Sequence, residues 1–315
     1  PPIYVAGLGP CLKEEYFKKL IEKNPKSHFY HSPDALDMSL IFNVILAEAS
    51  RSNLALNKQD KYLRSTGEYF KHEFLLSDKE SRVNLGLVWS ERRCFYTVNP
   101  PSGYGINLVL RDPTGAKVRF RPVFNGDGSC IIHLDDPMPG KWTLLAQHAI
   151  MRGPVRGTSG VIDLDSTISS NLAIPSAVKR SENIELSLSL LSDGREAIER
   201  ASVEARILKP RYSVEDVLNQ YERELESIEV EAEEGGAGDP RLKLNALREQ
   251  KLQAGVDILP TDALSMPLNE KGDGTYSSIL SSTHTPGIYD VEITINGANP
   301  KTGLPFTRLE RRSIF

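Results

Sequence analysis

One short stretch of the chain has the residue types and spacing of a metal-binding loop. In "DSTIS", Asp165, Thr167 and Ser169 match the pattern D-x-[ST]-x-S. A carboxylate and two hydroxyls at alternate positions offer the oxygen ligands that Mg²⁺ prefers. The residues that follow, "SNLAIPS", predict another strand rather than a helix, which is the wrong context for such a loop. We therefore expect a linker between two domains at this point.

The carboxylates of "DLD" are the other candidate metal ligands. Asp163 and Asp165 stand at a predicted domain junction, where they either bind Ca²⁺ or face water. "NGDG" (125–128) and "KGDG" (271–274) also contain oxygen ligands. Asn-Gly and Asp-Gly are strong hairpin-turn signals, however, so we expect turns there.

The patterns that could support catalysis are incomplete. "HEFLL", residues 72–76, begins like H-E-x-x-H but has Leu76 where the zinc motif needs a second histidine. His28 and His31 flank an aromatic pair, and we expect them to be solvated or to cap an element rather than to bind metal. There is no G-x-S-x-G, and "GLGP" lacks the glycines of a phosphate loop. We expect a chain that is not an enzyme and binds no cofactor.

Composition and charge limit the classes of partner. The chain has 315 residues, is 39% hydrophobic and carries a net charge of −4, which fits two or three ordinary domains and argues against a broad nucleic-acid interface. No apolar run approaches the roughly 20 residues that span a membrane. The basic cluster "RLERR", residues 308–312, reads as a solvated strand edge that blocks aggregation. Cys94 and Cys130 could form a disulfide, but buried free thiols are the favoured reading.

Residues 1–52 show the alternation of an α/β domain with a parallel sheet. The pattern predicts a strand at 2–6, a helix at 12–24, a strand at 27–31 and a helix at 33–50. Two strands and two helices make only about half of such a domain. We expect the open strand edge and the bare helix faces to be covered by an upstream chain, a second copy or the neighbouring sandwich.

Residues 53–165 and 166–315 each predict a β-sandwich. Short segments rich in β-branched and aromatic residues alternate with turn signals such as "DPTG" and "PMPG". The second sandwich is interrupted at 213–255 by a strongly helical stretch, which begins with Ser213 as its cap and Asp216 three residues later. We predict a helical hairpin inserted between two strands.

The two arms of this hairpin carry opposite charge, acidic in "ERELESIEVEAEE" and basic in "RLKLNALREQK". The arms either pack on each other or present a surface to a protein partner or a second copy of the chain. For the second interpretation the apolar residues Tyr221, Leu225, Leu244 and Leu247 are the candidate partner-binding residues.

The segment "IYVAGLGP" through "SPDALDMSLIFNVILAEA" resembles the C-terminal half of a von Willebrand factor A domain. "VNLGLVWS", "LVLRDPTG" and "GKWTLLAQ" resemble the sandwich that follows that domain in calcium-activated chloride channel regulator proteins. The last unit, through "GIYDVEITINGANPKTGLPFTR", resembles the immunoglobulin-like or fibronectin-like domain of the same architecture.

The resemblance implies a non-enzymatic role in protein binding, adhesion or scaffolding, in a secreted, periplasmic or cell-surface protein. It also implies that this chain is a C-terminal portion and that the family's divalent ion, Mg²⁺ or Ca²⁺, is held by loops that precede Pro1. Two alternatives remain open. The chain could be the regulatory tail of a self-cleaving metalloprotease of the channel regulator type, or an intracellular scaffold.

Overall fold

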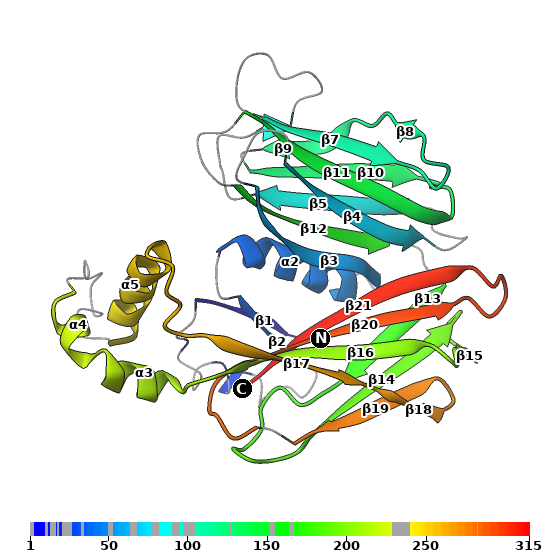
Figure 1. Ribbon diagram of the computed structural model, residues 1–315. Coiled ribbons are helices and arrows are strands. Elements are labelled where there is room, and N and C mark those ends of the chain that lie inside the picture. Colours follow the sequence, from blue (N-terminus) through cyan, green and yellow to red (C-terminus); the bar gives the residue numbers. More distant parts are fainter. Residues whose placement is uncertain are drawn as a thin grey trace.

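Two β-sandwiches make up most of the structure, with helix α2 and a pair of parallel strands between them (Figure 1). This architecture is seen in a computed structural model of the chain. It describes residues 3–9, 12, 17, 19–20, 27–32, 35–49, 53–63, 68–76, 82–89, 95–96, 105–126, 128–150, 155–163, 167–228, 240–281 and 283–315.

The first sandwich is built from two sheets of five strands each. One sheet has the order β3 (Asn53–Leu63), β12 (Val155–Asp163), β5 (Arg82–Trp89), β10 (Ser129–Asp135) and β9 (Pro122–Gly126). The other has the order β4 (Tyr69–Leu76), β11 (Gly140–Ile150), β7 (Gly105–Arg111) and β6 (Phe95–Tyr96), with β8 (Lys117–Val118) paired to β7. Alternate residues point inward, as in β5, where Val83, Leu85, Leu87 and Trp89 are buried.

The second sandwich consists of two sheets whose strands pair antiparallel. One has the order β13 (Ile168–Ala173), β14 (Ile184–Ser192), β19 (Thr275–Leu280) and β18 (Asn269–Gly272), with β15 (Glu196–Ala197) paired to β14. The other has the order β17 (Thr261–Pro267), β16 (Ser202–Pro210), β20 (Tyr289–Ala298) and β21 (Pro305–Ile314). Their inward side chains form a separate apolar core.

Two of the predicted turns have the expected backbone geometry. Asp273 and Gly274 join β18 to β19 with φ of 51° and 67°, which is the pair of positive angles that a type I′ hairpin requires. In "DPTG" the amide of Gly115 donates to the carbonyl of Asp112 at 2.9 Å, and the Asp112 carboxylate accepts from the amide of Thr114 at 2.9 Å. The prediction that these Asp and Gly residues form turns is confirmed.

Residues near the start of the chain form a parallel strand pair and a helix. Strands β1 (Tyr4–Leu8) and β2 (His28–Ser32) pair in parallel, and α2 (Ala35–Ala49) follows. Of the helix predicted at 12–24, only Leu12, Phe17, Lys19 and Leu20 are described, and the last three are helical. The rest of that prediction lies outside the described residues.

The second sandwich covers much of this small α/β unit. Ile41, Val44 and Ala47 of α2 pack with Tyr30 of β2 and with Leu309 of β21. On the other side of the strand pair, Val5 and Phe29 pack with Phe315, and the Phe29 and Phe315 rings meet edge to face at 4.8 Å. Helix α2 also contacts β3 and β12 of the first sandwich. The sequence left three candidates for what covers this unit: an upstream chain, a second copy or the neighbouring sandwich. In the structure, both sandwiches contact it.

The helical insert leaves the second sandwich between β16 and β17. It contains α3 (Val214–Gln220), α4 (Glu222–Glu226) and α5 (Pro240–Gln253). Ser213 and Asp216 form the predicted capping box. An ion pair of 2.6 Å joins Lys251 of α5 to Glu224 of α4, so the oppositely charged arms do pack together.

Candidate functional site

The basic cluster at the end of the chain is buried, which corrects the expectation of a solvated strand edge. Arg308, Arg311 and Arg312 are each less than a tenth exposed. Strand β21 is the last strand of its sheet, but β2 of the α/β unit and β3 and β4 of the first sandwich contact it and remove these side chains from water. Buried guanidinium groups need anionic or carbonyl partners. Arg308 Nη1 donates to the carbonyl of Thr307 at 2.9 Å, and Arg312 is paired with Glu48.

Arg312 connects the last strand to helix α2 through Tyr30. Its Nη2 forms an ion pair with Glu48, and its Nη1 donates to the Tyr30 hydroxyl at 3.0 Å. The same hydroxyl donates to Glu48 Oε2 at 2.6 Å, which closes a three-membered network. Burial raises the pKa of Tyr30, so the phenol stays protonated and keeps both roles.

Glu310 lies two residues away in β21 and accepts a hydrogen bond from the Ser170 hydroxyl in β13. Burial raises the pKa of Glu310 to about 7, against the opposing effects of Arg312 and of the Ser170 hydrogen bond. Its protonation state therefore changes near neutral pH.

A second network joins His31 of β2 to Asp290 of β20 and Ser313 of β21. His31 Nδ1 lies 3.2 Å from Asp290 Oδ2, and the other Asp290 oxygen accepts from the Ser313 hydroxyl at 2.6 Å. The backbone amide of His31 donates to Ser313 Oγ at 2.8 Å, which completes the ring. His31 Nε2 lies 3.0 Å from the carbonyl of Gly9.

The partners of His31 determine its charge. A carbonyl and an ionised carboxylate can only accept, so both ring nitrogens carry protons and His31 is an imidazolium. Burial alone lowers the pKa of His31, but the hydrogen bond and charge of Asp290, with the Gly9 carbonyl, outweigh it and raise that pKa. Burial likewise acts to raise the pKa of Asp290, yet His31, Arg311 and Ser313 together lower it. The pair is a charged brace.

Ser313, His31 and Asp290 are far apart in the sequence, and the structure brings them together. Their arrangement differs from a nucleophilic triad, in which the serine hydroxyl donates to the histidine. Here the Ser313 hydroxyl donates to Asp290, and both nitrogens of His31 are occupied. His31 is thus neither solvated nor a cap, as had been expected, but part of a buried ion pair.

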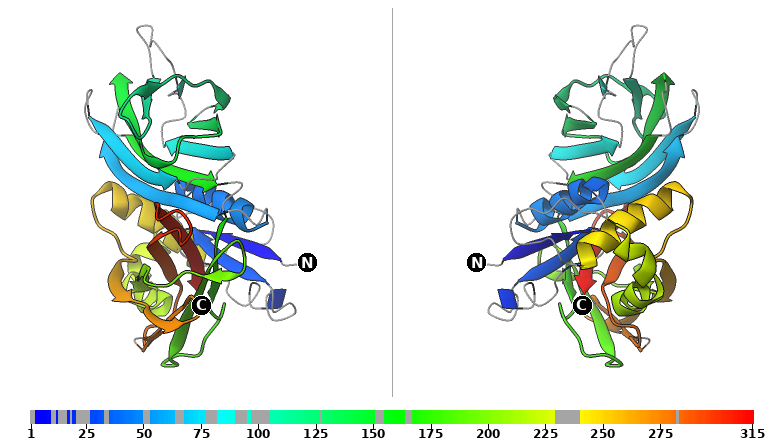
Figure 2. Two further views of the ribbon diagram at one scale, coloured as in Figure 1. Left: turned by 90° about the vertical axis from the view of Figure 1, so that its right-hand side faces the viewer. Right: turned by 90° about the vertical axis from the view of Figure 1, so that its left-hand side faces the viewer.

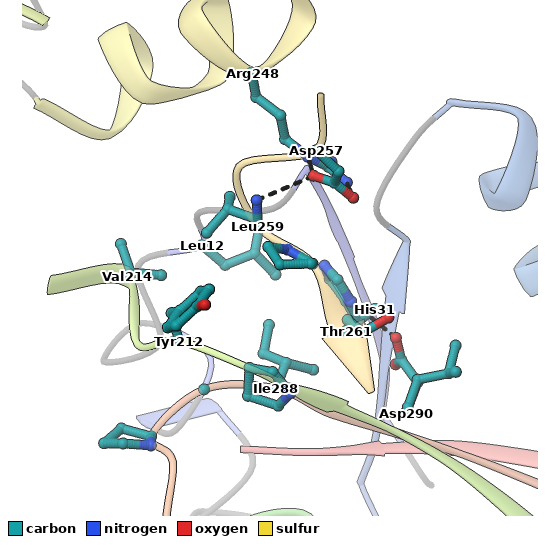
Figure 3. Close-up of a pocket in the computed structure, with 15 residues that line it drawn as sticks. Leu12, His31, Tyr212, Val214, Arg248, Asp257, Leu259, Thr261, Ile288 and Asp290 are labelled. Atoms are coloured by element: carbon teal, nitrogen blue, oxygen red, sulfur yellow. Dashed lines mark hydrogen bonds and ion pairs between the residues drawn. The ribbon is translucent and has the colours of Figure 1, made fainter. Parts of the chain in front are cut away.

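A pocket of about 170 Å³ opens beside this brace (Figure 3). His31 and Asp290 line one side, and Leu208, Val214, Leu259 and Ile288 supply apolar wall. Leu12 comes from the α/β unit, Val214 from the helical insert, and Ile288 from just before β20. Tyr212 also lines the pocket and is 47% exposed, so the pocket reaches the surface there.

The polar side chains across the pocket are also paired with each other. Arg248 of α5 donates through Nε to Asp257 Oδ1 at 3.2 Å and through Nη2 to Asp257 Oδ2 at 3.5 Å. The amide of Leu259 donates to the same carboxylate at 3.0 Å (Figure 3). Apolar walls with a few fixed polar groups at the ends favour binding of an apolar group in a defined orientation.

The candidate residues from the sequence lie elsewhere. Leu225, Leu244 and Leu247 are buried in the core of the insert, and half-buried Tyr221 packs against that core, so they hold the insert together rather than forming an exposed binding face. Asp163 ends strand β12, and its side chain is not among those described. Asp165 lies outside the described residues.

The histidine of "HEFLL" is buried in a strand, since the segment belongs to β4 and His72 is hardly exposed. Cys130 is a buried free thiol, and burial raises its pKa to about 12. Among the residues that the structure describes, no three His, Cys, Asp or Glu side chains gather as a metal site would require, and no helix has the length and apolar character of a membrane span.

Comparison with known proteins finds similarity only among solved structures. No family model and no curated protein matches the chain. A DUF4785 family protein from Legionella pneumophila is 10% identical over 82% of this chain and 64% of that one, with a TM-score of 0.44. A Bacillus licheniformis lipase in propeptide form is 13% identical over 84% and 41%, with a TM-score of 0.39. Trypsin-activated alpha-2-macroglobulin from Escherichia coli is 14% identical over 78% and 15%, with a TM-score of 0.26.

The chain therefore spans 41% and 64% of the lipase and the DUF4785 structures. Identities and TM-scores of this size support no argument about function. What stands is a sheet-rich architecture of β-sandwiches.

Proposed function

We propose that this chain is a non-enzymatic, protein-binding part of a larger protein and that the pocket receives one apolar side chain of the partner. The observation that carries the proposal is the combination of an apolar wall with charged side chains that are already paired. Paired groups can orient a ligand, but they offer no free base or nucleophile for a reaction.

The size of the pocket agrees with a single side chain. A cavity of about 150 Å³ lined by apolar residues holds one benzene molecule. At about 170 Å³, this pocket has room for one ring or one branched aliphatic group. Burying such a group contributes about 1.5–3 kcal/mol, which is enough to select a residue but not to bind a peptide tightly alone.

We also propose that β1, β2 and α2 are the last part of a von Willebrand factor A domain. The parallel pairing of β1 with β2 and the helix that follows agree with the last part of such a domain. Ile3 and Leu8 beside or in β1, and Phe42 and Leu46 in α2, are exposed apolar residues. A protein partner, or an upstream part of the same protein, would cover such residues.

Peptide selection against the chain tests this function. Thr261 lines the pocket and is exposed at the start of β17, so Thr261→Trp would place an indole over the pocket without disturbing a core. Ser265→Trp, on the same exposed side of the same strand, is the matched control.

We expect selected peptides to share one large apolar residue, and Thr261→Trp to weaken their binding about tenfold, a change of about 1.4 kcal/mol. Ser265→Trp should leave binding unchanged. Peptides that bind both variants equally, or that are cleaved by the chain, would refute the proposal.

A further inference from the structure

A row of basic side chains marks one edge of the first sandwich, far from the pocket in sequence. The segment from Lys117 to Gly126 passes from one sheet of this sandwich to the other. Its first residues, in β8, pair with β7 of one sheet, and its last residues, in β9, pair with β10 of the other. Strand β9 is the end strand of its sheet within the described part of the chain.

The inward and outward residues of this segment alternate. Val118 and Phe120 pack against the core of the sandwich. Lys117, Arg119 and Arg121 occupy the positions between and beside them and are exposed. Lys117 lies in β8, and Arg119 and Arg121 lie in the connection between β8 and β9. The three cations alternate with inward residues and face solvent as a row.

These three cations have no anionic partner within the described part of the protein. No ion pair or side-chain hydrogen bond joins Lys117, Arg119 or Arg121 to another described residue. The adjacent carboxylate, Asp112, is committed to its own turn, where it accepts from the amides of Thr114 and Ala116. Elsewhere on this sandwich, Lys71 and Lys141 both form ion pairs with Glu73. Some of the exposed cations on this sandwich are therefore paired, in contrast to the row.

The row continues into exposed apolar residues on the edge strand. Val123 is 65% exposed and Phe124 is 52% exposed. Phe124 lies opposite Ile131 of β10, which is also exposed. Basic residues and a proline such as Pro122 also protect a sheet edge from aggregation. That role does not require exposed apolar neighbours.

We propose that Lys117, Arg119, Arg121 and the edge of β9 form a second binding surface, which takes an extended acidic segment of a partner protein. An extended segment with carboxylates at alternate positions could pair them with the cations of the row, and its apolar residues would meet Val123 and Phe124. Exposed apolar residues, and a strand that ends its sheet within the described part of the chain, favour a peptide over a sulfated polysaccharide, which would use the cations alone. This surface is independent of the pocket.

Fluorescence anisotropy with labelled peptides tests the surface. One peptide carries glutamates at alternate positions with valines between them, and the other has the same composition with its glutamates in one block. The variant Lys117→Glu, Arg119→Glu, Arg121→Glu reverses the row. The control Lys179→Glu, Arg195→Glu, Lys271→Glu makes the same change in net charge at exposed positions of the second sandwich.

We expect the alternating peptide to bind about tenfold more tightly than the block peptide, and the reversed row to lose about tenfold in affinity. The control variant should bind as the wild type does. Binding should also weaken between low salt and about 0.5 M salt, because exposed charges are then screened. Equal binding of the two peptides, an equal loss in the control, or binding of sulfated oligosaccharides alone would each overturn the proposal.

Discussion

Arg312 in the last strand, β21, forms a buried ion pair with Glu48 in helix α2, near the other end of the chain. Tyr30 of β2 bonds to both partners. The last strand of the second sandwich is thereby tied to β2 and α2 of the α/β unit, and the view from the side shows these elements packed between the two sandwiches (Figure 2). This tie and the His31–Asp290 brace hold the wall of the pocket in place.

Removing the guanidinium of Arg312 should destabilise the fold severely. Arg312→Ala leaves the Glu48 carboxylate buried without its cation, and breaking a buried pair in this way costs about 3–5 kcal/mol. Tyr30→Phe removes two hydrogen bonds but no charge and should cost about 1–3 kcal/mol. Urea unfolding measures both, with the exposed Arg195→Ala as a control expected within about 0.5 kcal/mol of wild type. An Arg312→Ala protein as stable as the control would show that the network contributes nothing.

Glu310 should make stability fall as the pH rises toward neutrality. Its pKa is about 7 in the folded protein and 4.5 for an ordinary glutamate, so the folded state holds the proton more tightly. The stabilising contribution is complete below about 4.5 and is lost as the pH rises through about 7, with an upper limit of about 3 kcal/mol. Arg312, Glu48 and Ser170 are the groups that act on this carboxyl.

Glu310→Gln, which cannot ionise, isolates this effect. We expect wild type to lose stability relative to Glu310→Gln between pH 5 and pH 7.5, as measured by urea unfolding at each pH. A constant difference between the two proteins over this range would contradict the assignment.

The His31–Asp290 pair should be most stabilising in mildly acidic solution. Because the pKa of His31 is raised in the folded protein, its contribution to the free energy of unfolding is present below pH 6.5 and is lost as the pH rises through the folded pKa. Because the pKa of Asp290 is lowered, its contribution is present above pH 3.8 and is lost as the pH falls through the folded pKa. Both contributions are complete between about pH 3.8 and pH 6.5.

NMR titration of the His31 ring protons tests this pair directly. The variant Asp290→Asn lacks the negative charge that raises the pKa of His31, while the burial that lowers this pKa remains. His31 should therefore titrate at lower pH than in wild type. Asp257→Asn also changes a carboxylate that lines the pocket but does not bond to His31, and it should leave the titration unchanged. A His31 titration that is the same in all three proteins would disprove the ion pair.

Two glycines with nearly the same φ should lose different amounts of stability when each is replaced by alanine. Gly274 has φ of 67°, and a Cβ there would lie 2.4 Å from the carbonyl oxygen of Leu190. Gly194 has φ of 66°, and a Cβ there would meet nothing within 4 Å. Gly194→Ala should cost about 1–2 kcal/mol for the left-handed backbone alone. Gly274→Ala should cost more, because the backbone must also move, and equal losses in urea unfolding would refute the close approach.

Much of the β-structure could be predicted from the sequence because alternation and turn chemistry are local signals. Strand β5 alternates apolar and polar residues along its length, and "KGDG" carries its turn type in two residues. Three strands had no such signal. Strand β12 contains Gly157 and Gly160, β3 is polar over its second half, and β17 is an edge strand with no buried residue.

The buried networks could not be predicted, because their partners come from distant parts of the chain. A cluster such as "RLERR" reads as surface until α2 and β2 are known to pack on it. His31 likewise meets Asp290 only through the docking of the strand pair on the second sandwich. The pocket was missed for the same reason, since its wall is assembled from the α/β unit, the insert and the sandwich.

The most direct test of the pocket as a binding site is methyl NMR during titration with N-acetyl-phenylalaninamide, a single aromatic side chain with capped ends. We expect concentration-dependent shifts of the methyl signals of Leu208, Leu259 and Ile288, which line the pocket, and their loss in Thr261→Trp. Leu85 and Leu87, in the core of the first sandwich, should not shift. An absence of shifts at the pocket methyls, or shifts that persist in Thr261→Trp, would contradict the central claim.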